Sequence, residues 1–208
     1  MIAVSAAFAC PSHALAQEST VAIDPGVASE GVRQVAGWAI ASGDSGGLPF
    51  IVIDKVAAHV FLFGAGGEPL GAAPALLGIA TGDDTAPGIG DIKMSKIPKG
   101  DRTTPAGRFV GRVATVRGMG SVLWVDYASA VALHAVVTSN KKERRLQRLN
   151  SPTPDDNRIT FGCINVPTAF YADSVRPLFA KGGLVYILPE GKPLDAAIPG
   201  FRPQATAR

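Results

Sequence analysis

The order of apolar and polar residues along the chain predicts a mainly β domain. Apolar residues at nearly helical spacing predict a short amphipathic helix over 27–42, with Trp38 as its core anchor. From residue 50 onward, short runs rich in β-branched and aromatic residues alternate with turns that contain Gly and Pro. The segments that this pattern predicts as strands are 50–54, 58–63, part of 70–79, 109–116, 122–126, 131–137 and 184–188.

Two long segments interrupt the pattern of strands. Residues 80–100 show no periodicity and predict a loop, and loops of this length inside a domain tend to be functional. Residues 138–158 are polar and basic and predict a second irregular connection. Pro167 fits the first turn of a helix over about residues 167–175, which would begin just after the short apolar segment 162–166.

Composition indicates one turn-rich domain. A chain of 208 residues has the length of a single domain with a small appendage. Its 24 Gly and 16 Pro are too many for a helical bundle and favour β structure. Charged residues make up 18% and apolar residues 47%, which excludes a disordered, highly charged protein.

The charge is concentrated in one place. The net charge is +3, and the run 141–148 alone contains five cations and one anion. Nucleic-acid-binding domains show a broad basic face with a recognisable motif, so we expect no nucleic-acid partner. The run is interpreted as a solvated basic loop or helix end, and the alternative is contact with an acidic polymer or substrate.

The N-terminal residues resemble an export signal. An apolar run over 2–10 is followed by Ala14 and Ala16, which form the A-x-A pattern of a signal-peptidase site. The run is too short to span a bilayer. We therefore predict a signal peptide over 1–16, export to the periplasm or cell envelope, and no integral membrane segment after cleavage. A lipoprotein signal that ends at Cys10 is an alternative.

Cleavage after Ala16 would leave Cys163 as the only thiol, because the other cysteine is Cys10. Exported cysteines normally pair, so an unpaired one is either buried and inert or kept as a nucleophile. The alternative is a Cys10–Cys163 disulfide in an uncleaved chain.

Of the three histidines, His13 would be lost with the signal and His59 is interpreted as structural. The third, His134, lies in the predicted strand 131–137, where alternation places it on one face with Ala132 and Val136. No arrangement of metal ligands remains, and we expect neither a metal nor a cofactor.

Cys163 lies in the segment 160–165 (TFGCIN). Gly162 permits a tight turn, and Thr160 and Asn165 bracket the thiol. The N–H groups at the start of a helix directly after Cys163 would lower the thiol pKa and could hold an oxyanion. A Cys–His pair is the minimum for thiolate attack on an amide. On spacing alone, a buried cysteine and a satisfied core histidine remain alternatives.

Together these residues resemble the catalytic domain of the L,D-transpeptidase (YkuD-like) family. That family's signature is a His, a gap, then Ser/Thr-His-Gly-Cys, an apolar residue and Asn or Arg. The match is His134, a gap of 25 residues over 135–159, and the segment 160–165. The segment 103–109 (TTPAGRF) also resembles the family's T-P-x-G-x-F turn.

The resemblance covers about residues 47–189 and implies an L,D-transpeptidase-like β-sandwich with one or two short helices. Residues 17–46 would form an N-terminal helix and linker, and 190–208 a loose C-terminal tail. Phe161 stands where the family has its second His. The gap is longer than the family usually shows, and we interpret it as a lid or rim inserted over the cleft.

The resemblance also implies a reaction. His134 would take the proton of Cys163 and hold the thiolate as an ion pair, while the backbone carbonyl of Ala135 orients the ring. N–H groups around Gly162 and Cys163 would bind the oxyanion. The thiolate would attack the third residue of a peptidoglycan stem tetrapeptide, release the terminal D-alanine, and pass the acyl group to a second stem in a 3-3 cross-link.

Thr160, Asn165 and Arg158 are the expected substrate-binding residues, with Arg158 and the basic run facing the substrate's carboxylates. The partners would be peptidoglycan stem peptides, and the protein would be a monomer. Attack by water in place of the second stem would give an L,D-carboxypeptidase. A different exported cysteine amidase and a non-enzymatic wall-binding module of the same fold are also compatible with the sequence.

Overall fold

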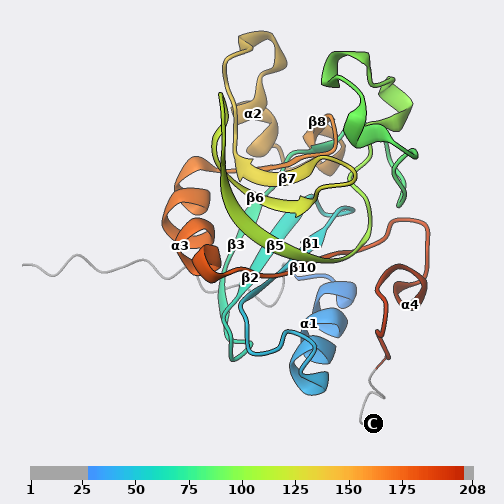
Figure 1. The fold of residues 1–208 in the computed structure, drawn as a ribbon, viewed down its shortest axis with the longest axis vertical. Coiled ribbons are helices and arrows are strands. Elements are labelled where there is room, and N and C mark those ends of the chain that lie inside the picture. The colour runs from blue at the N-terminus through green and yellow to red at the C-terminus, as the bar shows by residue number, and fades with distance from the viewer. Residues whose placement is uncertain (1–27, 204–208) are drawn as a thin grey trace, which may run out of the picture.

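The computed structural model describes residues 28–203 and contains an eight-stranded sheet in the order β3-β2-β1-β10-β5-β6-β7-β9 (Figure 1). A two-stranded parallel pair, β4-β8, accompanies it. The strands are β1 Phe50–Asp54, β2 His59–Phe63, β3 Pro69–Pro74, β4 Leu77–Gly78, β5 Gly107–Val116, β6 Gly120–Asp126, β7 Val131–Ala135, β8 Arg158–Thr160, β9 Ile164–Val166 and β10 Gly183–Ile187. The predicted mainly β class is confirmed.

The described helices are short, apart from the first. The α-helices are α1 Glu30–Ser42, α2 Arg145–Leu149, α3 Arg176–Leu178 and α4 Leu194–Ala197. A π-helical segment, η6 Phe170–Val175, leads into α3. The 3-10 turns are η1 Ile89–Asp91, η2 Met94–Lys96, η3 Lys99–Asp101, η4 Lys141–Glu143, η5 Pro154–Asn157 and η7 Phe179–Lys181. The helix predicted over 27–42 is confirmed as α1, which begins at an N-cap serine, Ser29.

Strand β5 makes the sheet fold over on itself, because its two halves pair with different neighbours. Residues 107–111 pair with β10, and residues 112–116 pair with β6. At the change of partner stands Gly111, where a Cβ would lie 3.1 Å from side-chain atoms of Leu123 and Val185. The absence of a side chain there lets the two halves of the sheet approach closely.

The main core lies between the two halves of the folded sheet. Alternate residues of each strand point into it, including Ile51 and Ile53 of β1 and Leu133 of β7. The segment η6–α3 closes one side of this core with Tyr171 and other buried residues. At about 25 cal/mol per Å² of buried apolar surface, these side chains supply most of the stabilisation.

A second core fills the space between the sheet and α1. Trp38 is 6% exposed and meets the rings of Tyr186 and Phe201 edge-on, at centroid distances of 6.0 and 5.6 Å. Trp38 is therefore the core anchor that its spacing predicts. Ile198 is also fully buried in this cluster. The prediction of a loose tail from residue 190 is wrong as far as Phe201, because these apolar side chains pack against α1.

The helix predicted over about residues 167–175 is confirmed, but it does not start directly after Cys163. Strand β9, rather than a helix, follows the cysteine, because Ile164 and Val166 alternate into the core and pair in parallel with β7. The helical segment begins only beyond Pro167. No helix start lies next to the thiol, so that source of a lowered thiol pKa is missing.

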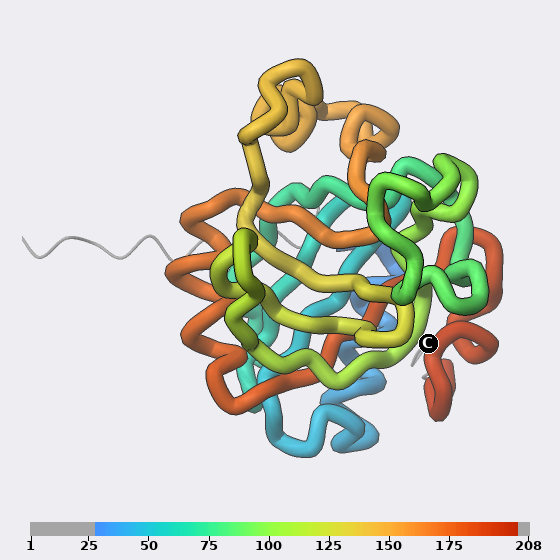
Figure 2. The backbone as a smooth tube through the Cα atoms, turned by 45° about the horizontal axis from the view of Figure 1, so that its top comes forward, coloured from blue at the N-terminus to red at the C-terminus, as the bar shows by residue number. Residues whose placement is uncertain are grey.

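The two long interruptions form arms at the same end of the sheet (Figure 2). The loop after residue 80 contains η1, η2 and η3, and the segment 138–158 contains η4, α2 and η5. Residues 1–16, with Cys10 and His13, lie outside the described residues, as do 204–208. In the part of the chain that is described, no helix is long and apolar enough to cross a bilayer.

A buried ion pair fastens the first arm to the sheet. The Lys55 ammonium donates to the carbonyls of Gly82 and Thr104 and to Asp83 Oδ1 at 2.9 Å. The Asp83 carboxylate also accepts three backbone N–H groups from residues 190–192. Burial by itself would raise the pKa of Asp83, but these donors hold it well below its usual range.

We predict that Lys55→Met lowers the free energy of unfolding by about 3–5 kcal/mol, because it leaves the Asp83 carboxylate buried without its counter-ion. Urea denaturation measures this loss. Folding lowers the pKa of Asp83. The ion pair therefore stabilises the wild type at pH values above the pKa of an unfolded Asp, about 3.9. The difference between wild type and variant should therefore narrow as the pH falls below about 4.

Lys192→Met is the matched control, because Lys192 pairs with Asp84 at the surface, with side chains 43% and 75% exposed. It should cost less than about 1 kcal/mol. Equal losses in the two variants would contradict the prediction.

Candidate functional site

Cys163 and His134 line one cavity of about 280 Å³. Its polar lining comes from the two predicted catalytic side chains and from Arg145, Thr160 and Asn165. The rest of the wall is apolar and is formed by Met94, Met119, Val137 and Phe161. The cavity therefore brings together a thiol, an imidazole and a mainly apolar enclosure, contributed by both arms and by the outer face of β7 and β9.

Strand pairing places the imidazole. β7 and β9 run parallel with His134 opposite Asn165, and their neighbours Leu133 and Ile164 point into the main core. Because side chains alternate along a strand, His134 and Asn165 share the opposite, outer face. The alternation predicted for His134 is confirmed.

The turn between β8 and β9 places the thiol. Gly162 has φ +124°, and a Cβ there would lie 2.8 Å from the carbonyl oxygen of Thr103. The Thr160 hydroxyl donates to the Cys163 carbonyl at 2.6 Å, and the Thr104 hydroxyl donates to the Gly162 carbonyl at 2.8 Å. The TTPAGRF segment thus supports the cysteine turn directly, although nearly 60 residues separate the two in sequence.

The backbone N–H groups of this turn differ in availability. The N–H of Gly162 donates to Thr160 Oγ1 at 3.2 Å, so the predicted oxyanion donor already has a partner. Among residues 28–203, the Cys163 N–H donates none of the backbone hydrogen bonds of the turns and loops, which makes it the better candidate of the two predicted donors.

A chain of hydrogen bonds sets the protonation of His134. Its Nδ1 lies 2.8 Å from the Ala135 carbonyl, which can only accept, and its Nε2 lies 3.2 Å from Asn165 Nδ2. Arg145 Nη1 donates to Asn165 Oδ1 at 2.7 Å. Since a guanidinium can only donate, the amide oxygen must face Arg145 and the amide nitrogen must face the ring. His134 is therefore the neutral tautomer with its proton on Nδ1, and Ala135 orients the ring as predicted.

Burial shifts both catalytic groups toward their neutral forms. Burial lowers the pKa of His134, and the positive charge of Arg145 lowers it further, whereas the hydrogen bond to the Ala135 carbonyl raises it. Burial raises the pKa of Cys163, although the Ala132 N–H and Arg145 oppose this. The sulfur lies 3.7 Å from the carbonyl oxygen of Ala130. These shifts favour a thiol and a neutral imidazole at rest over the predicted ion pair, and Cys163 itself is only partly buried.

The structure does not bring Arg158 to this cavity. Its guanidinium donates to the Lys55 carbonyl at 3.0 Å and forms an ion pair with Glu190. The prediction that Arg158 faces the substrate's carboxylates is therefore corrected: its charge is already used within the protein. Thr160 and Asn165 do line the cavity, but they are 2% and 1% exposed and bond to the turn and to the imidazole.

Sequence reasoning missed the side chains that the arms contribute. Arg145 belongs to the basic run, but nothing in the run distinguishes it from its neighbours. Met94 belongs to the loop predicted to be functional. Phe161 lies in the β8–β9 turn, with the Arg102 guanidinium 3.9 Å from its ring centroid. Among the described residues, no three His, Cys, Asp or Glu side chains are grouped as metal ligands would be.

Comparison with known proteins finds similarity only among solved structures: no protein-family model and no curated protein matches this sequence. An L,D-transpeptidase from Xylanimonas cellulosilytica is 16% identical, with a TM-score of 0.39, over 68% of this chain and 60% of that one. The L,D-transpeptidase catalytic domain from E. faecium is 16% identical, with a TM-score of 0.37, over 67% and 95%.

An L,D-transpeptidase from Mycobacterium smegmatis is 17% identical, with a TM-score of 0.38, over 67% of this chain and 58% of that one. This chain thus spans less than two thirds of the length of the Xylanimonas and Mycobacterium proteins. These structures come from the family that the sequence motifs resemble.

We predict that Cys163 is alkylated slowly by iodoacetamide at neutral pH and faster above about pH 8.5, because its raised pKa keeps it a thiol below that range. Peptide mapping by mass spectrometry measures the rate at Cys163 alone. A fast rate that stays constant down to pH 6 would show a thiolate–imidazolium pair and contradict the neutral resting state.

Proposed function

We propose that this protein is a cysteine acyltransferase of the cell wall, an L,D-transpeptidase that acts on peptidoglycan stem tetrapeptides. The observation that carries the proposal is that the Cys163 thiol and the His134 imidazole line one cavity. The unprotonated ring nitrogen, Nε2, is the proposed base once it gives up its bond with Asn165. The sequence motifs add the substrate class. Export and action as a monomer in the periplasm or cell envelope belong to the same proposal.

The first half-reaction transfers an acyl group to sulfur. His134 Nε2 exchanges its bond with Asn165 for the Cys163 proton as the sulfur attacks the carbonyl carbon of the third stem residue. The Cys163 N–H stabilises the oxyanion, and such a donor is worth about 3 kcal/mol. As the carbon–nitrogen bond breaks, the imidazolium returns the proton to the amine of the departing D-alanine. A thioester and a neutral imidazole remain.

The second half-reaction releases the enzyme. A side-chain amine of a second stem attacks the thioester carbonyl, His134 accepts a proton from that amine, and the sulfur leaves and is reprotonated. The product is a 3-3 cross-link. The apolar walls from Met94, Met119 and Phe161 limit the access of water to the thioester and so favour transfer over hydrolysis.

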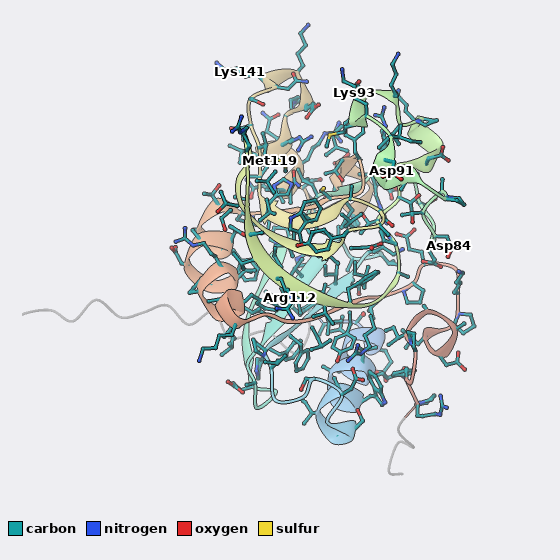
Figure 3. All side chains as sticks on the ribbon, viewed as in Figure 1. Asp84, Asp91, Lys93, Arg112, Met119 and Lys141 are labelled. Carbon is teal, nitrogen blue, oxygen red and sulfur yellow. The ribbon has the colours of Figure 1, made fainter. Side chains whose placement is uncertain are left out.

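Each arm that contributes to the cavity wall also carries exposed lysines. Lys93 projects from one arm and Lys141 from the other (Figure 3). Both lysines and Lys142 are exposed. Stem peptides carry carboxylates, so we propose that the segment 138–158 forms a basic rim that attracts these peptides. This rim would be the lid or rim that the long gap between His134 and the segment 160–165 led us to expect.

We predict that Cys163→Ala abolishes turnover of a disaccharide-tetrapeptide but leaves its binding intact, because only the nucleophile is removed. His134→Ala should slow turnover by about 10²–10⁴-fold. Mass spectrometry of the products measures both. His59→Ala is the matched control, since His59 lies in β2 with its Nδ1 near the Ala57 carbonyl, and it should keep the wild-type rate.

The products separate the candidate activities. A cross-linked dimer means transfer, and loss of alanine alone means an L,D-carboxypeptidase. Binding without any turnover by the wild type means a wall-binding module. A carbapenem should form an adduct that maps to Cys163, as the family resemblance implies. Full activity of Cys163→Ala would refute the proposed site.

We predict that the double variant Lys141→Gln/Lys142→Gln raises KM about threefold at low salt and leaves kcat unchanged, because these exposed charges attract the substrate without touching the reacting atoms. The difference from wild type should shrink as salt screens the charges. Arg176→Gln/Lys181→Gln, also exposed but in the α3–η7 region, should leave KM unchanged. Equal effects of the two double variants would contradict a role for this rim.

A further inference from the structure

We propose that Arg145, which the segment between β7 and β8 contributes, is a positioning residue of the Cys–His pair: it orients the Asn165 amide, and that amide holds His134 with Nε2 unprotonated. The catalytic consequence rests on the proposed function. The hydrogen-bond chain itself does not, and it can be tested on the folded protein without substrate.

The contacts form an unbroken chain from the arm to the ring. Arg145 Nη1 lies 2.7 Å from Asn165 Oδ1, and Asn165 Nδ2 lies 3.2 Å from His134 Nε2. Asn165 is 1% and His134 is 6% exposed, and the Arg145 side chain is 13% exposed. Little water therefore competes for these bonds, and each bond constrains the next.

Arg145 decides which end of the Asn165 amide meets the ring. An amide can present either its oxygen or its NH₂ group, and only the oxygen can accept from a guanidinium. With Arg145 in place, the NH₂ group faces Nε2 and requires a lone pair there. Without Arg145 the amide is free to turn over and present its oxygen to Nε2, which favours a proton on that nitrogen and removes the base.

The charge of Arg145 acts in the same direction. A cation close to the ring disfavours the imidazolium, so His134 stays a neutral base. Among the cavity-lining side chains, only Arg145 from α2 and Cys163 from the β8–β9 turn are charged or titratable beside His134. The groups from the first arm and from the β5–β6 hairpin, Met94 and Met119, are uncharged.

Other hydrogen bonds stabilise the segment 138–158, so Arg145 is not required to hold this segment in its conformation. Arg148 on the same helix donates to the carbonyls of Glu143 and Asp156. Arg145 Nε donates to Glu143 Oε2 at 2.6 Å, which aims the guanidinium from behind and leaves Nη1 for Asn165. The segment 138–158 therefore has a specific role: it places the Arg145 guanidinium, a cation and hydrogen-bond donor, next to the amide that contacts His134.

The test compares Arg145→Met with Arg144→Met, which removes the same charge one residue away, from an exposed side chain that bonds to Gln147. NMR of protein labelled with ¹⁵N in histidine reports the ring tautomer and the titration midpoint of His134. In the wild type and in Arg144→Met we expect the Nδ1–H tautomer. In Arg145→Met we expect a midpoint raised by about one pH unit, because an amide oxygen facing Nε2 favours the imidazolium, while Ala135 keeps the proton on Nδ1. Arg145→Lys should restore most of the wild-type behaviour.

Glu143→Gln provides a second test, in which the His134 midpoint should shift in the opposite direction. It keeps the proposal testable if Arg145→Met does not fold. It removes the carboxylate bonded to Arg145 and leaves the guanidinium uncompensated, so the His134 midpoint should fall rather than rise. Thermal melting by circular dichroism checks that each variant is folded. An unchanged His134 midpoint in folded Arg145→Met, or in Glu143→Gln if the former does not fold, would overturn the proposal.

Kinetics separates positioning from substrate binding. A positioning role predicts that Arg145→Met lowers kcat about tenfold at neutral pH, shifts the acid limb of the pH profile upward, and changes KM by less than about twofold. A rise in KM with an unchanged ring titration would mean that Arg145 binds a substrate carboxylate, and would also overturn the proposal. Absence of any turnover by the wild type would count against the proposed function alone, because the NMR result does not depend on it.

Discussion

The parallel pairing of β7 with β9 is the constraint on which the candidate site depends. Its register sets His134 opposite Asn165, and the alternation of the two strands turns both side chains away from the main core. The same pairing ends the turn that carries Cys163, so one set of backbone hydrogen bonds places the thiol, the imidazole and the amide. The Thr104 hydroxyl, from the end of the first arm, then ties the turn to the rest of the domain.

Burial gives this arrangement its chemical character. In a water-filled cleft, a thiol and an imidazole could separate charge at little cost. Here burial pushes the pKa of Cys163 upward and that of His134 downward, and Arg145 opposes the imidazolium. Both shifts favour a neutral resting pair, and in the proposed reaction the proton moves when a carbonyl carbon is in place to receive the sulfur. A neutral thiol is also less exposed to unwanted oxidation than a thiolate.

The segment 138–158 has two proposed roles. Lys141 and Lys142 are exposed, Arg148 donates to backbone carbonyls within the arm, and Arg145 donates to the buried Asn165 amide beside the histidine. Attraction of an acidic substrate and control of the base would then come from neighbouring residues of one short helix and its flanks. A change in this arm could alter substrate capture and proton transfer separately.

The choice of Cys163 and His134 as a candidate pair came from the family resemblance of the motifs. The sequence alone determined the local features: most of the strands, helix α1 with Trp38 and the glycine turn at Cys163. These follow from periodicity and from residue types within a few positions of one another. Tertiary structure decided which side chains meet. It paired Arg158 with Glu190, brought Arg145 to Asn165, followed Cys163 with a strand, and buried Phe201 in the second core. Contacts of this kind, and the protonation states that burial imposes, depend on residues far apart in the chain, which no local pattern encodes.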